Sequence, residues 1–161
     1  MGYTHYWGFK KPAKNTAEKT EILYKKTVLE CQKVIKYYYK ENGGLSGYSA
    51  HTKLGQYGGI NLNGKGDQGH ETFILREHYN QNEGDFCKTA RKDYDIVVVA
   101  CLAILSYRMG HLISVESDGY SHEHIAGIQL DERVLNRKIM NNLMRNKKSH
   151  PINDGELLRA V

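Results

Sequence analysis

Residues 86–95 read Phe-Cys-Lys-Thr-Ala-Arg-Lys-Asp-Tyr-Asp, and residues 96–105 read Ile-Val-Val-Val-Ala-Cys-Leu-Ala-Ile-Leu. A cationic segment therefore leads directly into ten residues without a polar side chain, which folding must bury. The apolar stretch, taken from Asp93 to Met109, fits either a buried strand or a buried helix. Its length favours a helix, and Gly110 then supplies a C-terminal stop. This choice decides the fold, because a strand here would change the order of all the elements.

The start of this expected helix is a candidate anion site. Three cations, Lys88, Arg91 and Lys92, would stand beside the free amides of the first helical turn, and Thr89 and Tyr94 belong to the same segment. Amides and cations together suit a phosphate, a nucleotide or a carboxylate. The alternative is that these cations only pair with surface carboxylates, which contributes little to stability.

Outward from this segment, the N-terminal part of the chain predicts a strand and a long helix. Residues 2–9 are rich in aromatic residues and alternate as a strand does. Asn15 or Thr16 then begins a helix that runs to about Tyr39. Its apolar positions recur at steps of four and three and form one helical face: Tyr24, Val28, Cys31, Ile35 and Tyr38.

The middle and the end of the chain predict a hairpin, a strand and a last helix. Residues 43–69 hold nine of the sixteen glycines and form a loop with one short strand. The remaining expectations follow in chain order: strands at 59–62 and 69–77 joined across 63–68, a polar loop at 80–85, a strand at 112–116 and a helix at 131–146.

This order predicts an α+β single domain over residues 1–146 with a C-terminal tail at 147–161. Strand, helix, strand, strand, helix, strand is the order of a ferredoxin-like split βαβ unit with an antiparallel sheet, and a further helix follows it. In such a unit the first and third strands are neighbours. The first strand should therefore lie beside residues 70–76, on a sheet that helices cover on one face.

Composition places the chain among soluble globular proteins. It has 161 residues, a formal net charge of +5 and three cysteines without a CxxC pair. The longest apolar run is about half a membrane span, and no leader pattern is seen, so we expect a cytoplasmic protein without a membrane partner. Cys31 and Cys101 are expected to be buried. Cys87 lies near Lys88 and Arg91, yet a packed thiol is favoured over a reactive one.

The first strand carries the second candidate site. Tyr3, His5 and Trp7 share one face, where two aromatic rings around an imidazole would form a stacking platform for a base. The alternative is that this face is simply core, with the ring nitrogens of His5 satisfied locally.

His70-Glu71-Thr72 is the third candidate. His70 and Thr72 share a strand face and could donate two hydrogen bonds to a phosphate. Two-histidine phosphoesterases need two His-x-Ser/Thr triplets, and this is the only one in the chain. His5, His70 and Glu71 are therefore the candidates for general acid–base catalysis, although neighbours in a strand point to opposite faces.

Two further motifs are weaker. Residues 63–66, Asn-Gly-Lys-Gly, do not match a P-loop and predict a hairpin turn, although Lys65 and the turn amides could close over a ligand. Residues 121–124, Ser-His-Glu-His, lack the spacing of a zinc site, so a solvated loop is favoured and no metal or cofactor is expected.

Three blocks together resemble a family of small bacteriophage and bacterial proteins: Gly-Tyr-Thr-His-Tyr-Trp at 2–7, His70-Glu71-x-Phe73, and residues 86–95. The resemblance covers residues 2 to about 105, with Asp93 where that family has proline. It implies a phage setting and, by analogy with small phage proteins, an accessory or counter-defence role.

The sequence thus predicts a binding protein for a small phosphate-bearing ligand, favouring a nucleotide or cyclic nucleotide held without turnover. A homo-oligomer is expected, and no specific binding to long nucleic acid. A phosphodiesterase or nucleotide hydrolase that uses the same residues is the first alternative, and an inhibitor of a host protein is the second. The predicted ligand-binding residues are Tyr3, His5, Trp7, His70, Thr72, Lys88, Thr89, Arg91, Lys92 and Tyr94.

Overall fold

The computed structural model describes residues 2–56, 58–82 and 84–139. Short 3-10 turns occur at Gly66–Gln68, Gly110–Leu112 and Ser121–His124. In chain order the main elements are β1 (Thr4–Phe9), α1 (Ala17–Asn42), β2 (Leu45–Ser46), α2 (Tyr48–His51), β3 (Ile60–Gly64), β4 (Phe73–Leu75), β5 (Gly84–Lys88), α3 (Asp95–Met109), β6 (Ile113–Ser117) and α4 (Ile125–Leu135).

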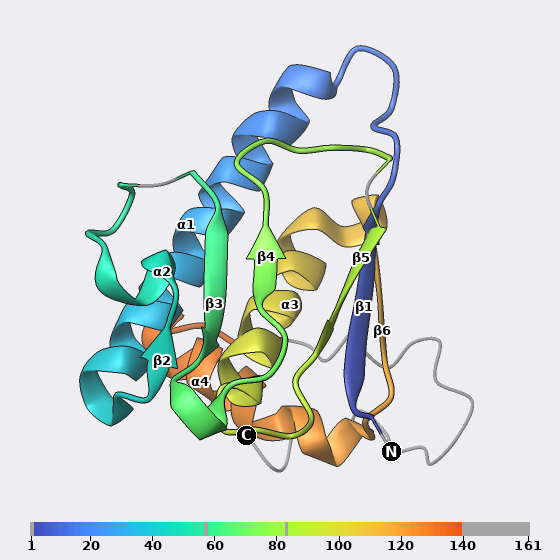
Figure 1. The fold of residues 1–161 in the computed structure, drawn as a ribbon. Coiled ribbons are helices and arrows are strands. Elements are labelled where there is room, and N and C mark those ends of the chain that lie inside the picture. The colour runs from blue at the N-terminus through green and yellow to red at the C-terminus, as the bar shows by residue number, and fades with distance from the viewer. Residues whose placement is uncertain (1, 57, 83, 140–161) are drawn as a thin grey trace.

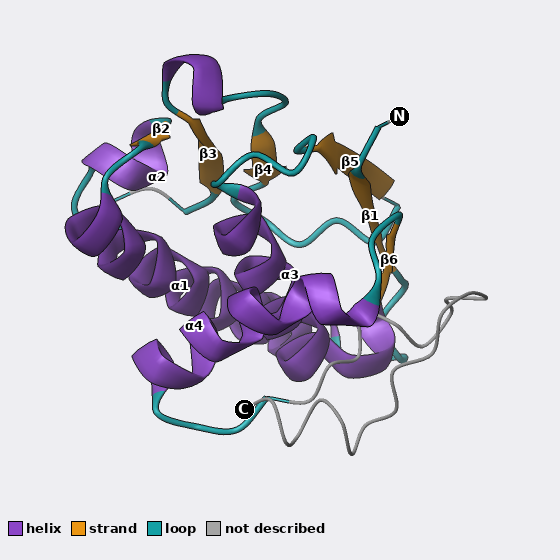
Figure 2. Ribbon diagram, turned by 90° about the horizontal axis from the view of Figure 1, so that it is seen from below, coloured by secondary structure: helices purple, strands orange, loops and turns teal. Residues whose placement is uncertain are grey.

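The strands form two antiparallel three-stranded sheets, ordered β5-β1-β6 and β2-β3-β4. They lie side by side in one layer (Figure 1), while α1, α3 and α4 form a second layer against one face (Figure 2). This arrangement confirms the predicted α+β class. No helix of the described residues lies over the other face of the β5-β1-β6 sheet, where Tyr6 and Phe86 are exposed.

Helix α3 confirms the helical interpretation of the apolar segment that follows residues 86–95. It runs from Asp95 to Met109, and Gly110 follows it with φ 57°, a left-handed conformation that favours glycine. The ten apolar residues 96–105 lie under the sheets and against α1 and α4, and nearly all are fully buried. The apolar face of α1 packs against them, with Tyr24, Val28, Cys31 and Ile35 buried as predicted.

The strand order differs from the ferredoxin-like expectation at one place. The 59–62 and 69–77 segments do form a hairpin, as β3 and β4, but β4 is short and does not pair with β1. The neighbours of β1 are β5 and β6. Strand β5 was expected to be polar loop and cationic segment, and it takes the place beside β1 that was predicted for residues 70–76.

The last predicted helix is also displaced. Helix α4 spans Ile125–Leu135, six residues earlier than predicted, because it continues directly from the 3-10 turn at Ser121–His124. Asn136, in the left-handed conformation, ends it. The predicted continuation over 140–146 and the predicted tail at 147–161 lie outside the described residues.

Within the described part of the chain, one segment, Asp95–Leu112, is long and apolar enough to span a membrane by length and composition alone. It is α3 with the turn that follows, and 67% of it is buried inside the protein. The core of a soluble domain accounts for such a helix equally well.

Candidate functional site

The inner face of β1 is core. Tyr3, His5 and Trp7 alternate toward the helices, and their exposed fractions are 1%, 0% and 5%. Trp7 packs edge-on against Phe73 of β4, with ring centroids 5.1 Å apart. The expected stacking platform is therefore not open to a base, because the helices cover the face that these rings share.

A buried hydrogen-bonded group of three side chains, His5, Thr89 and Asp95, lies beneath this sheet. Asp95 Oδ1 is 2.6 Å from His5 Nε2 and accepts a second hydrogen bond, also 2.6 Å, from Thr89 Oγ1. An ionised carboxylate only accepts, so the proton of the first contact resides on Nε2. His5 Nδ1 is buried and has no hydrogen-bond partner among the described residues. This group joins β1, the end of β5 and the first residue of α3.

The ring of Tyr3 and the ring of His124 enclose His5 on two further sides. Their centroids lie 5.0 Å and 5.9 Å from that of His5. Burial first, and then the Asp95 carboxylate, raise the pKa of the Tyr3 hydroxyl well above its usual value. His124 is fully buried and its Nε2 is 3.2 Å from Ser117 Oγ. The histidine that sequence placed in a solvated loop is thus part of the core.

Arg91 covers the outer side of the buried group around His5. Its guanidinium lies 4.3 Å from the ring centroid of Tyr3 and pairs with Glu123 at 2.8 Å. Burial is the largest single influence and opposes ionisation of Glu123, but the hydrogen bonds from Arg91 and from the Tyr120 amide, with the charge of Arg91, together lower the Glu123 pKa. Arg91 therefore holds the turn to the 121–124 segment, and its charge is already matched by a carboxylate.

The start of α3 does not offer the free amides that were expected. Asp95 N donates to Lys92 O, Ile96 N to Asp93 O, and both Val97 N and Val98 N to Tyr94 O. The preceding turn therefore takes up the amides of the first helical turn. Ala90 and Arg91, two consecutive non-glycine residues, adopt left-handed φ values of 51° and 56° in this turn.

His70, Glu71 and Thr72 join the two sheets instead of forming a catalytic pair. His70 is exposed and its Nδ1 lies 2.8 Å from Lys88 O. The carboxylate of Glu71 accepts from Lys88 N at 2.7 Å, and its backbone amide donates to Lys88 O. Thr72 Oγ1 accepts from Asn63 Nδ2. The segment before β4 is thereby fastened to the end of β5.

Cys87 and Tyr94 are packed residues beneath the same junction. Tyr94 is buried, and its hydroxyl donates to Glu71 O at 2.6 Å. Burial raises the pKa of the Cys87 thiol to about 12, and the cations beside it in sequence do not offset this. The packed-thiol interpretation of Cys87 is confirmed, as is that of Cys31 and Cys101.

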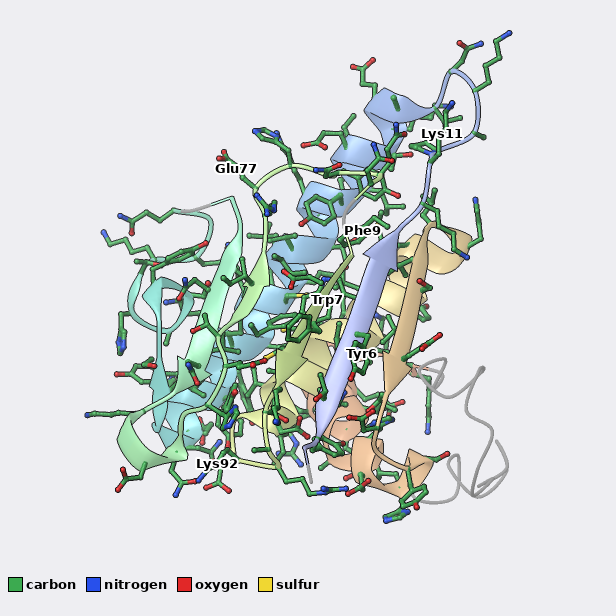
Figure 3. The ribbon with its side chains drawn as sticks, turned by 45° about the vertical axis from the view of Figure 1, so that its right-hand side comes forward. Tyr6, Trp7, Phe9, Lys11, Glu77 and Lys92 are labelled. Carbon is green, nitrogen blue, oxygen red and sulfur yellow. The ribbon has the colours of Figure 1, made fainter. Side chains whose placement is uncertain are left out.

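The outer face of the same two strands is open. Tyr6 and Phe86 pair across β1 and β5, are 43% and 55% exposed, and have ring centroids 6.3 Å apart. Lys88 follows Phe86 by two residues on the same strand and pairs with Thr4. Its side chain therefore lies on this face as well. Glu116 lies across from Tyr6 on β6. Figure 3 shows Tyr6 and Trp7 on opposite sides of β1.

Within residues 2–56, 58–82 and 84–139 no group of three or more His, Cys, Asp or Glu side chains converges on a position suited to a metal ion. Comparison with protein-family models, with curated proteins and with solved structures finds no match to this chain.

The structure brings together some predicted residues and adds others. His5, Thr89 and Arg91 do gather around one place, although its interior is closed. Sequence reasoning missed Asp95, Tyr6 and Phe86. The alternation of Phe86, Cys87 and Lys88 was a usable signal, since it is the pattern of a strand with one buried face. Nothing local marks Asp95 as the partner of His5, which is ninety residues away.

Proposed function

We propose that the protein binds a small phosphate-bearing ligand, a nucleotide or cyclic nucleotide, on the open face of β1 and β5. The observation that carries the proposal is the exposed aromatic pair Tyr6 and Phe86 with Lys88 on the same face. An aromatic surface beside a cation suits a base and its phosphate, because every base offers a flat π-face. The ligand-facing role first expected for Tyr3 and Trp7 thus passes to Tyr6 and Phe86.

The phosphate would lie at the end of this face where β1 begins and β5 ends, near Lys88. Lys88 and Lys92 form no ion pair with any described residue, unlike Arg91, which pairs with Glu123. His70 is exposed beside Lys88 and is held through its Nδ1. Figure 3 shows Lys92 at this end of the molecule. These three cationic or polar side chains can supply the charge that a phosphate requires.

In this proposal the protein sequesters its ligand without turnover, as a counter-defence protein of a phage would do in the cytoplasm of its host. The resemblance of three sequence blocks to phage proteins supports the setting. An oligomer would suit a two-fold cyclic ligand, since a subunit interface can enclose what a single open face only contacts.

Thermal-shift screening against a panel of linear and cyclic nucleotides tests the proposal. Ligand at about 100-fold above Kd should add roughly 2.7 kcal/mol of apparent stability. Phe86→Ala should weaken binding by about 5- to 150-fold, the range for loss of one stacked base. Tyr107→Ala is the matched control, because Tyr107 is similarly exposed but lies on α3. Absence of a shift with every phosphate compound would refute the proposal.

A hydrolase is the second candidate, and the 2.6 Å contact between His5 and Asp95 favours it. A histidine oriented by a carboxylate is the usual form of a general base. His5 is fully buried, so the turn that carries Arg91 would have to open first. Denaturing the protein after incubation with ligand separates the two functions: intact nucleotide in solution indicates sequestration, and a product that His5→Asn abolishes indicates catalysis.

A further inference from the structure

A cavity of about 580 Å³ lies at the other end of β4 from His70 and Lys88. Its walls are the start of β3, the outer side of β4 and the loop that follows β4, residues 76–80. This loop crosses the top of the strand layer in Figure 1, and Figure 3 places Glu77 far from Lys92. The cavity is therefore separate from the face proposed for the nucleotide.

The walls of this cavity are held in place by hydrogen bonds. Tyr24 donates to Arg76 O at 2.7 Å. The carboxylate of Glu21 on α1 accepts from His78 Nδ1 and from Tyr79 N, both at 2.9 Å. Burial is the largest single influence and opposes ionisation of Glu21, but the hydrogen bonds from His78 and from the Tyr79 amide, with the charges of His78 and Lys25, together lower the Glu21 pKa. A loop fixed at three of the four residues 76–79 presents a site formed before any ligand arrives.

Two glycines allow the walls to approach closely. A Cβ on Gly58 would lie 2.3 Å from Glu77 Cγ, and a Cβ on Gly59 would lie 2.4 Å from Leu75 O. A side chain at Gly59 would meet the backbone at the end of β4 and push the entrance of β3 away from it, whereas one at Gly58 would displace the side chain of Glu77. The shape of the cavity thus depends on Gly58, which was expected in a loop, and on Gly59, which was expected to begin a strand.

The lining combines an apolar surface with charged groups. Ile74 is 44% exposed on the outer side of β4, and Tyr48 of α2 also lines the cavity. Arg76 and Glu77 come from the loop. A guanidinium matches the geometry of a carboxylate or phosphate, and a carboxylate accepts from a hydroxyl or amino group. The volume is within the range of small-molecule sites, about 300–1,000 Å³.

We infer that this cavity is a second binding site, for a small organic anion with an apolar or aromatic body. The anionic group contacts Arg76, and the body packs on Ile74 and Tyr48. The inference does not depend on the nucleotide proposal, because no residue that lines the cavity belongs to the Lys88 face.

Phenyl phosphate tests the inference, because inorganic phosphate and phenol are its two halves. Titrations followed by amide NMR should show phenyl phosphate shifting the signals of residues 74–80, at least tenfold more tightly than either half. Arg76→Gln should weaken this binding about tenfold, which is the loss of one charge-assisted hydrogen bond. Ile74→Ser should weaken it as well, and Lys26→Gln, an exposed cation of α1, should not.

The same spectra separate this inference from the nucleotide proposal. Shifts confined to residues 86–92 would overturn the cavity site and support the open face. Equal affinity for phenyl phosphate and for one of its halves would overturn the inferred ligand class. If phenyl phosphate binds in the cavity but no nucleotide binds to the protein, only the nucleotide proposal is overturned.

Discussion

On the inner face of β1, Tyr3, His5 and Trp7 pack under the helices, whereas on the outer face Tyr6 stays 43% exposed beside Phe86. Both faces carry aromatic rings, and both lie beside β5. They differ only in which side of the strand the helices cover. Strand periodicity placed Tyr3, His5 and Trp7 on one face correctly, but whether that face meets solvent was decided by α1, α3 and α4, elements far away in sequence.

The comparison is sharpest within β5, where Cys87 points inward between two outward residues. At pH 8 a thiol of pKa about 12 has more than about 1,000-fold less thiolate than an ordinary one. A Phe86→Cys variant should therefore react with a disulfide reagent more than about 1,000-fold faster than native Cys87. Because the pKa is raised, the rate at Cys87 should rise about tenfold per pH unit up to that value.

The kinetics can be read with an absorbance assay on the native protein, with urea-unfolded protein as the control in which all thiols react. Fast reaction of the unsubstituted native protein at pH 8 would contradict the inward position of Cys87 and of the two other buried cysteines.

Truncating neighbouring rings of β1 should give very different stabilities. Trp7→Ala removes a core side chain that packs on Phe73 and should cost about 3–5 kcal/mol of unfolding free energy. Tyr6→Ala, one residue away, should change it by less than about 1 kcal/mol. Urea denaturation followed by far-UV circular dichroism measures both. Equal losses would mean that the outer face is covered in solution, for example by a second copy of the chain.

The buried carboxylate under β1 is the next test. Asp95→Ala removes the acceptor of both His5 and Thr89 and should cost about 3 kcal/mol, because two buried donors lose their partner. Thr89→Val should cost about half as much. Asp93→Ala, in the same turn but exposed, should stay within about 0.5 kcal/mol. A small effect of Asp95→Ala would show that water or another group satisfies His5.

Local patterns in the sequence predicted β1, α1 and α3, because each carries a strong periodicity or an unbroken apolar run. They did not predict β5. Gly84–Lys88 is an edge strand with three exposed residues, so its apolar signal is limited to alternation around Cys87. The order of the strands could not be predicted from local patterns either, because long-range packing decides whether β4 or β5 pairs with β1.

The candidate site, like the fold, was predicted only in part. His5, Thr89 and Arg91 were named from sequence and do lie together, but their roles were not predictable. Arg91 is matched by Glu123, and His5 by Asp95, through contacts 32 and 90 residues apart. Lys88 and Lys92 are the cations of this segment that face outward. Composition alone could not show that Arg91, unlike these two lysines, is paired with a carboxylate.

The smallest expected effect is in the turn that joins the two faces. Ala90 has φ 51°, which costs an L-residue with a Cβ roughly 1–2 kcal/mol, so Ala90→Gly should relieve that strain. The greater entropy of glycine in the unfolded chain offsets part of the gain, and we expect a net stabilisation of about 0.5 kcal/mol. Ala126→Gly, at an exposed helical position of α4, should instead destabilise by up to about 1 kcal/mol. Opposite signs for the two alanines, measured by urea denaturation, would establish the left-handed turn that places Arg91 over Tyr3, whereas a loss at both would mean that residue 90 is not left-handed in solution.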